Sequence, residues 1–469
     1  MPTEDDKDRR IAELERENAE LRSELETRVA ELEKQVRNLL AQLGRNSLNS
    51  SLPPSRDNAE ARKQRKKKAK GRRKRGGQKG HKRATRELLP PDEVVDHVPE
   101  HCHRCAADLE GEDKEPERHQ VIDVPMLKGH VTEHRYHTVG CNRCGAKTTA
   151  ARGDEYKHGA FGPRLSALVC LLTGSYRMSK RNVKELLSDV LGINIALGTV
   201  SKIEARATDV LEVAHREALT HIRSSPFVNM DETGWVERNA KAWLWVASTS
   251  QVAYYAIKPD RSSEVVINIL GEDFTGIVGN DRARAYLALE PVQRQVCWFH
   301  LGRNFQSKIE LGGEAARFGE QMRAFERRLF KAHHLWRADD ITHESFQRRM
   351  KMLRGEVLTA LYAWQDHDVD GVGGMCRNLL GLEPALWTFV KHPNVEPTNN
   401  VAEQDMRHPV IWRRSSFGTD RPRGSRFVER VLTVRQSLKK QGRRVFDFFA
   451  KFLSAVRGGA SPPSLLPLT

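Results

Sequence analysis

The 469-residue sequence lacks any apolar run of the roughly 18 residues that a membrane-spanning helix needs. Its start, from Met1 to Asp6, is charged and does not resemble a signal peptide. We therefore expect a soluble, cytoplasmic protein with no membrane partner. The length exceeds that of one compact core and predicts several domains.

Cysteine is scarce, with seven residues in the whole chain. Four of them form two Cys-x-x-Cys pairs, namely Cys102 with Cys105 and Cys141 with Cys144. This number argues against a disulfide scaffold, and the paired spacing favours a metal site. Strand-like runs at 119–124 and 130–136 lie between the pairs, as in a zinc ribbon, where four thiolates close one structural Zn²⁺ site. A redox dithiol is the alternative interpretation.

Acidic residues are nearly absent from residues 56–86. This segment has 16 Lys or Arg residues and two acids, Asp57 and Glu60, so it holds +14 of the formal charge of +16. Such a tract repels itself and buries no apolar surface, so we expect it to be disordered until it binds a polyanion, most naturally nucleic acid. The residues expected to contact DNA are Arg65, Lys66, Lys67, Lys68, Arg72, Arg73, Lys74, Arg75 and Lys79.

Apolar residues at separations of three and four dominate residues 8–43, with charged residues between them. This pattern predicts a coiled coil, and Asn18 at a core position favours a two-stranded register. A homodimer or higher oligomer is therefore expected. A single solvated helix is the alternative.

Further along, residues 160–222 have helical periodicity, with a glycine-containing turn at 191–195. A helix-turn-helix and plain helical packing fit this segment equally well. From Pro226 the pattern becomes strand-like. It predicts strands at 227–231, 242–249 and 251–257, a helix at 262–270, a strand at 276–280, a helix at 284–289 and a strand at 294–299. This is the ribonuclease H-like order.

About a hundred residues of helical periodicity follow and predict an inserted helical domain. Its charged face is a candidate DNA contact, although solvated helix faces are common. The basic residues on it are Arg327, Arg328, Arg348, Arg349 and Lys351.

Three acids lie where the predicted elements begin or end. Asp231 closes the first strand, Asp281 follows the fourth, and Glu403 opens a helix after Asn399. In the predicted order they converge at one sheet edge, where carboxylates suit two divalent cations. Asp231 and Asp281 are also plausible turn residues, Glu403 a plausible capping acid, and Asp405 a rival to Glu403.

Several short motifs occur in a specific order. They are Asn49-Ser50-Ser51-Leu52-Pro53-Pro54-Ser55, Gly76-Gly77-Gln78-Lys79-Gly80-His81, the two Cys-x-x-Cys pairs, Asp231-Glu232-Thr233, Cys297-Trp298-Phe299-His300 and Asn399-Asn400-Val401-Ala402-Glu403. Together they resemble the bacterial insertion sequence 66 family of DDE transposases over residues 30–440.

The resemblance implies that Asp231, Asp281 and Glu403 are a DDE triad holding Mg²⁺ or Mn²⁺, two ions per site. It also implies that the substrate is the double-stranded DNA of transposon ends and target, cleaved and then joined. A bacterial, nucleoid-associated protein with possible accessory transposition proteins follows from it. Cys297 and His300 match a Cys-x-x-His signature of DDE enzymes with a helical insertion; packing at a strand end is the other interpretation.

The predicted fold class is multidomain α/β, with a ribonuclease H-like catalytic core, a helical insertion, an N-terminal coiled coil and a zinc ribbon. The predicted parts are 1–44 coiled coil, 45–90 basic linker, 91–155 zinc ribbon, 156–225 helical domain, 226–300 first part of the core, 301–395 insertion, 396–456 last helices of the core and 457–469 tail. Rival functions are a non-catalytic zinc-ribbon DNA-binding protein, a domesticated transposase, and a repair or RNA-directed nuclease.

Overall fold

The computed structural model describes residues 16–29, 31, 32, 60, 63, 88–109, 117–152, 159–367 and 369–467. The chain divides into two compact units, residues 1–69 with 205–469, and residues 70–204. Among the described residues, no helix combines the length and the apolar character needed to cross a bilayer.

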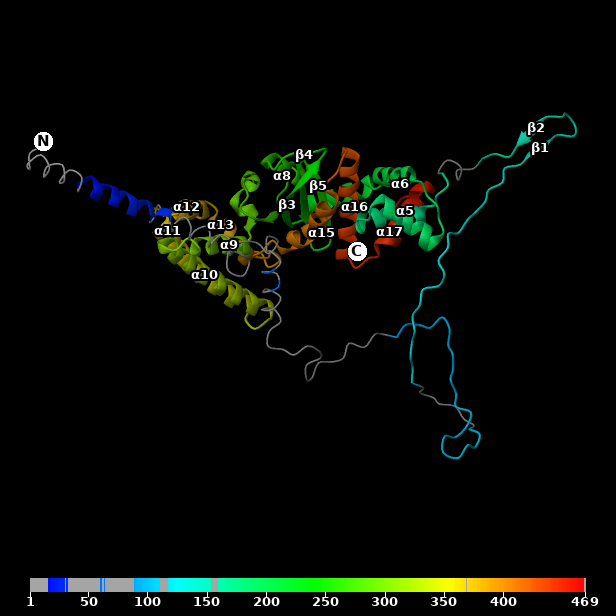
Figure 1. Cartoon of the computed structure of the whole chain (residues 1–469), viewed down its shortest axis with the longest axis horizontal. Coiled ribbons are helices and arrows are strands. Elements are labelled where there is room, and N and C mark those ends of the chain that lie inside the picture. The colour runs from blue at the N-terminus through cyan, green and yellow to red at the C-terminus, as the bar shows by residue number, and fades with distance from the viewer. Residues whose placement is uncertain are drawn as a thin grey trace, which may run out of the picture. The chain divides into compact units, whose positions relative to one another are not determined.

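The unit of residues 70–204 contains a two-stranded hairpin and short helices (Figure 1). Its elements are β1 (Thr138–Gly140), β2 (Lys147–Thr149), α4 (Pro163–Cys170), the π-helix η2 (Leu171–Ser175) and α5 (Lys180–Leu191). Helix α6 (Leu197–Val210) spans the boundary between the units. The runs at 119–124 and 130–136 are not strands, so that prediction was wrong. Val121 and Val131 are exposed there, 82% and 87%, and no neighbouring strand pairs with them.

Helices α5 and α6 follow one another across a short turn. The first ends at Gly192, whose φ of 63° suits glycine, and the Ile193 N–H bonds to the Leu187 carbonyl at 2.9 Å. Lys180 at the start of α5 pairs with Glu204 of α6 at 2.6 Å and donates to the Ser201 hydroxyl at 2.9 Å. These bonds fix the helix pair, and a DNA-reading role for it stays a prediction.

The other unit is built on a five-stranded sheet followed by helices. Its first elements are α7 (Glu212–Ser224), β3 (Phe227–Glu237), β4 (Ala240–Ser248), β5 (Ala253–Lys258), α8 (Ser263–Leu270), β6 (Ile277–Asn280), the 3-10 turns η3 (Arg284–Ala288) and η4 (Pro291–Gln293), and β7 (Arg294–Val296). Then come α9 (Trp298–Ile309), α10 (Gly313–Arg337), α11 (His343–Trp364), α12 (Val372–Gly381), α13 (Glu383–Leu386), α14 (Thr388–Lys391), α15 (Asn400–Ser416), α16 (Pro422–Lys440) and α17 (Val445–Arg457).

The strand order in this sheet is β5-β4-β3-β6-β7. The pairs β3–β4 and β4–β5 are antiparallel, whereas β3–β6 and β6–β7 are parallel. This is the predicted succession of three antiparallel strands, a helix and two further strands. The predicted strand at 294–299 ends early, at Val296, because Trp298 already begins α9 and its N–H bonds to the Pro397 carbonyl.

Helices cover both edges of the sheet. At edge strand β5, the N–H groups of Ala253 and Tyr255 donate to the hydroxyls of Ser437 and Thr433 of α16, each at 3.0 Å. At the opposite edge, the Phe389 N–H of α14 donates to Gln295 of β7 at 2.9 Å. Covered edges leave no row of unpaired strand groups for aggregation.

Helices α9 to α14 form a helical insertion at one end of the sheet (Figure 1). Large buried side chains from α9, α10 and α11 fill its core, with Phe305 and Phe318 meeting edge to face. These helices thus share a hydrophobic core. That they form a domain inserted in a ribonuclease H-like core stays a prediction.

Residues 16–29 are helical and every described side chain there is exposed. The stripe of Leu21, Leu25 and Val29 includes side chains up to 67% exposed. An unburied apolar stripe is what a partner helix covers. The coiled coil itself stays a prediction, since residues 8–15 and 33–43 lie outside the described residues.

Candidate active site

Asp231 lies on β3, the central strand of the sheet, between β4 and β6. Its Oδ1 accepts the N–H of Glu232 at 2.9 Å. Burial raises the pKa of Asp231 well above its usual value, and the charges of Glu232, Asp281 and Glu403 raise it further. Asp231 is therefore a half-buried carboxyl beside three other acids, and a bound cation would offset their like charge.

Asp281 directly follows β6. In the parallel register, Asn229 of β3 stands opposite Gly279 of β6, so Asp231 and Asp281 are each two residues beyond a paired position. This brings the two acids to the same sheet edge. Asp281 Oδ1 accepts the Ala283 N–H at 2.7 Å, as a turn residue does. Its second oxygen, Oδ2, lies 3.9 Å from the Arg261 guanidinium.

Glu403 occupies the first turn of α15, and Asn399 fixes that turn. The Asn399 side chain donates to the Met230 carbonyl at 2.7 Å, next to Asp231 in β3. Its backbone N–H donates to Cys297 Sγ at 3.3 Å. The start of α15 is therefore fastened to β3 and to the end of β7.

The other end of α15 is fastened to the same strand. Arg413 donates to the Thr233 hydroxyl at 3.0 Å and also to the Gly234 carbonyl. Helix α15 thus lies along β3 with a bond near each end, and Glu403 is presented toward the edge that bears Asp231.

Asp405, the rival to Glu403, is buried elsewhere. It is 3% exposed, and its carboxylate accepts from Gln436 at 2.7 Å, from Ser248, and from Lys440 at 2.8 Å. Every oxygen of this carboxylate has a partner. Asp405 therefore joins α15 to α16 and β4 and has no oxygen left for a substrate-facing ion.

The structure thus gathers Asp231, Asp281 and Glu403 from β3, β6 and α15. A family model described as the IS66 family of transposases matches residues 158–426, more than half of the chain. The chain belongs to the IS66 transposase family. A second model, of a family of unknown function designated DUF6444, matches residues 1–87, and no curated protein matches the transposase.

Three residues beside this candidate site were missed from the sequence. Glu232 is almost fully buried, accepts the Tyr286 hydroxyl at 2.8 Å, and pairs with Arg261. The Arg261 guanidinium also lies 3.9 Å from Asp281 and 5.2 Å from the Trp243 ring centroid. The Asp-Glu-Thr motif contained Glu232, but nothing in the sequence linked it to partners 29 and 54 residues away.

Gly279, in the strand before Asp281, packs closely against β3. A Cβ added at Gly279 would lie 2.7 Å from Asn229 Oδ1 and 3.1 Å from the Phe227 ring. We expect Gly279→Ala to lower the free energy of unfolding by about 1 to 3 kcal/mol through overpacking.

Chemical denaturation measures this effect. The matched control is Gly355→Ala, on the exposed side of α11 with open space around it. There alanine is expected to add about 1 kcal/mol of stability, because its helix propensity exceeds that of glycine. Equal effects at the two positions would contradict the close approach of β6 to β3.

Cys297 and His300 stand beside Glu403. Within the described residues, these three form the one group of at least three metal-ligating side chains whose ligand atoms all lie within 4.8 Å. Burial lowers the pKa of His300, as does Arg303, while burial raises the pKa of Cys297 to about 11. Asp231, Asp281 and Glu403 approach one another less closely than this group.

The two Cys-x-x-Cys pairs adopt the same turn. In each turn, the N–H of the first Cys donates to the carbonyl of the residue five positions later. The N–H of the residue four positions later donates to the carbonyl of the first Cys. The bonds are Cys102 to Ala107 at 2.8 Å, Ala106 to Cys102 at 2.9 Å, Cys141 to Ala146 at 2.8 Å and Gly145 to Cys141 at 2.8 Å. Backbone N–H groups lower the pKa of Cys102 and of Cys141.

Although each turn is shaped like a metal knuckle, the four thiols do not gather into one cluster in the described chain. A structural Zn²⁺ on Cys102, Cys105, Cys141 and Cys144 stays a prediction. The nine basic residues expected to contact DNA lie outside the described residues.

The two turns differ at one backbone position. Gly145 has a φ of 72°, whereas the equivalent Ala106 has a φ of 58°, which strains a residue with a Cβ. We expect Ala106→Gly to remove about 1 kcal/mol of backbone strain and so to raise the affinity of the cysteine site for zinc about fivefold. Competition against a chromogenic chelator measures it. Ala107→Gly, where φ is not positive, is the control, and an equal gain there would contradict the explanation.

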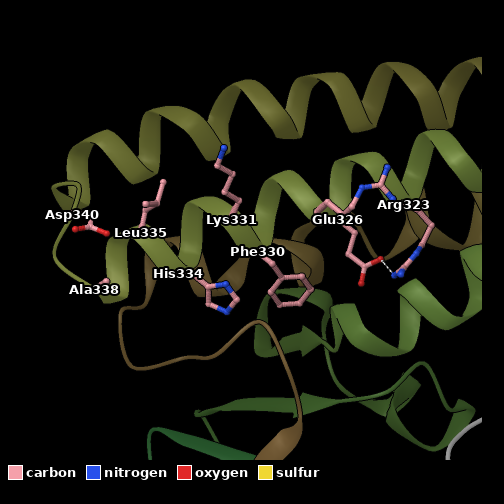
Figure 2. Close-up of a pocket in the computed structure, with 9 residues that line it drawn as sticks. Arg323, Glu326, Phe330, Lys331, His334, Leu335, Ala338 and Asp340 are labelled. Atoms are coloured by element: carbon pink, nitrogen blue, oxygen red, sulfur yellow. Dashed lines mark hydrogen bonds and ion pairs between the residues drawn. The ribbon is translucent and has the colours of Figure 1, made fainter. Parts of the chain in front are cut away.

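A groove of about 570 Å³ lies on α10 (Figure 2). Phe330 forms part of its wall and stacks on Phe299, with 4.9 Å between the ring centroids. Phe299 directly precedes His300 in the sequence. Arg327, Lys331 and His334 also line it. Of the basic face predicted for the insertion, Arg328 is instead paired with Glu356 at 2.7 Å.

Proposed function

We propose that the chain is a DDE transposase that cleaves DNA at the terminal inverted repeats of a mobile element and joins the ends to target DNA. A ribonuclease H-like core would hold the site, and the order β5-β4-β3-β6-β7, with two antiparallel and two parallel pairings, supports that fold. The observation on which the proposal rests is the convergence of Asp231, Asp281 and Glu403. Burial and Glu232 raise the pKa of Asp231 most, and the charges of Asp281 and Glu403 raise it further.

The donor set fits Mg²⁺ or Mn²⁺. All three side chains offer carboxylate oxygens, which these hard cations prefer. The Arg261 guanidinium, which lies 3.9 Å from Asp281, is already paired with Glu232. A divalent pair would supply activation of the attacking oxygen and stabilisation of the leaving oxygen.

The protein residues have distinct roles in this proposal. Asp231 would hold the ions together with Asp281 and Glu403, since it lies on the central strand with Asp281 on one side and α15 against it. The bonds of Asn399 and Arg413 to β3 would keep Glu403 in register with Asp231. Tyr286 and Arg261 would hold Glu232 away from the phosphate-facing edge.

Two displacements at phosphorus would follow. In the first, water attacks the scissile phosphate, the bond from phosphorus to the 3'-oxygen breaks, and a 3'-hydroxyl and a 5'-phosphate result. In the second, that 3'-hydroxyl attacks a target phosphate, forming one ester bond as another breaks. Neither step needs a covalent protein intermediate.

Other parts would bind and pair the DNA ends. The basic tract around Arg65 to Lys79 would contact backbone phosphates, and the two cysteine turns would hold Zn²⁺ in a ribbon. The α10 groove, with Arg327 and Lys331 beside Phe330, would extend this path next to the acids. A coiled coil of residues 8–43 would join two protomers, so that two ends meet in one assembly.

A cleavage assay tests the proposal. Purified full-length protein with Mg²⁺ is incubated with DNA carrying the sequences that flank its gene, and we expect nicks at the repeat ends followed by joined products. Chelation of the metal should stop both reactions. Specific binding to these ends without any cleavage would contradict the proposal and favour a non-catalytic DNA-binding protein.

A further inference from the structure

Cys297, His300 and Glu403 come from two helix starts that the chain places against each other. Cys297 precedes α9, His300 lies in its first turn, and Glu403 lies in the first turn of α15. Their sulfur, nitrogen and oxygen ligand atoms are all within 4.8 Å of one another. Cys297 is completely buried, so its thiol faces this cluster and not solvent.

Two polar atoms of the cluster are buried without a hydrogen bond. They are His300 Nδ1 and Glu403 Oε1, which face each other at 3.5 Å. That separation is too long for an ordinary hydrogen bond. A buried polar atom left unpaired costs about 1 to 3 kcal/mol, and an ion is one of the partners that commonly satisfies such atoms.

The donor set selects the kind of ion. Thiolate, imidazole and carboxylate together are typical zinc ligands, whereas Mg²⁺ takes oxygen alone. The Asn399 N–H on Cys297 Sγ would support a bound thiolate, as amides around metal-ligating sulfurs do. Three protein ligands leave one tetrahedral position open.

We propose that Cys297, His300 and Glu403 bind Zn²⁺ or a cation of similar chemistry, and that the bound ion withholds Glu403 from Asp231 and Asp281. The second half rests on the proposed function. Glu403 has one carboxylate, and in this structure it is closer to Cys297 and His300 than the three acids are to one another. Zinc at this site therefore opposes the magnesium chemistry of the triad.

Cobalt binding tests the site without any activity measurement. The full-length protein with Cys102→Ser and Cys141→Ser removes predicted ribbon ligands, so that a thiolate-to-cobalt absorption band reports the new site. We expect one equivalent of Co²⁺ with this band, displaced by Zn²⁺. Adding Cys297→Ala or His300→Ala should weaken binding about tenfold or more.

The control is Cys376→Ala, a completely buried cysteine in the insertion core, which should leave the band unchanged. Circular dichroism confirms that each variant is folded. Absence of the band in the protein with Cys297 intact, or its persistence after Cys297→Ala, overturns the site.

Cleavage tests the consequence. In Mg²⁺, zinc beyond one equivalent should slow the unsubstituted protein at least about tenfold, and the Cys297→Ser variant much less, each relative to its own zinc-free rate. Equal inhibition of both overturns the antagonism. If no protein cleaves, the transposase proposal fails, while the cobalt result still decides the site.

Discussion

Replacing Asp231 by asparagine is expected to abolish DNA cleavage while making the metal-free protein more stable. Activity should fall by about a thousandfold or more, because losing a metal carboxylate removes several kcal/mol of transition-state stabilisation. Stability should rise because burial and three neighbouring acids raise the pKa of Asp231, so its charged form destabilises the fold. A gain of about 1 kcal/mol corresponds to a rise of about 2 to 4 °C in Tm.

The pH dependence has a definite sign. A raised folded pKa means that the stability of the unsubstituted protein falls as pH rises above the ordinary value of 3.8. The Tm advantage of Asp231→Asn should therefore grow as pH rises above 3.8 and disappear as pH falls toward that value. Mg²⁺ should raise the Tm of the unsubstituted protein and not that of the variant.

Differential scanning fluorimetry and the cleavage assay together measure these effects. Asp273→Asn, at an exposed acid between α8 and β6, is the matched control and should change neither quantity appreciably. A variant that loses activity and stability together would place Asp231 in the fold and not in the metal site.

Asp405→Ala is expected to lower the free energy of unfolding by about 3 to 5 kcal/mol. The substitution leaves the Lys440 ammonium buried and uncompensated, and it removes the acceptor of Ser248 and Gln436. Glu403→Gln, two residues away, should instead keep stability within about 1 kcal/mol and lose cleavage. Urea unfolding followed by the same cleavage assay separates the two acids.

A double variant sharpens this prediction. Asp405→Leu with Lys440→Met replaces the buried ion pair by apolar side chains, which often costs little. It should be more stable than Asp405→Ala alone. If Asp405→Ala were as stable as the unsubstituted protein yet inactive, Asp405 and not Glu403 would be the third acid.

The strand order of the core was predictable because each strand has a recognisable local sequence pattern. Val228 and Met230 alternate with polar neighbours along β3, and the acids follow where the apolar runs stop. The equivalent reasoning was wrong at 119–124, which is also rich in β-branched residues. A strand also requires a partner, and nothing local specifies one.

The site was only partly predictable for a related reason. Asp231 and Asp281 are placed by strand register, which follows from the order of elements. The choice of Glu403 over Asp405 depends on Lys440 and Ser248, which are 35 and 157 residues from Asp405. Glu403 lies in the first turn of α15 and Asp405 only two residues further on, so position along the helix favoured Glu403 without deciding between them.

The segment between Cys297 and Asn399 leaves and rejoins the core at a single point. The Asn399 N–H touches Cys297 Sγ, and the Trp298 N–H touches the Pro397 carbonyl, so the two ends of the hundred-residue insertion are neighbours. A segment whose ends are adjacent can gain or lose residues without changing the distance between those ends. The helical segment could therefore lengthen, shorten or be replaced during evolution. The spacing between Asp231 and Glu403 would stay the same, because the two ends of the segment remain adjacent.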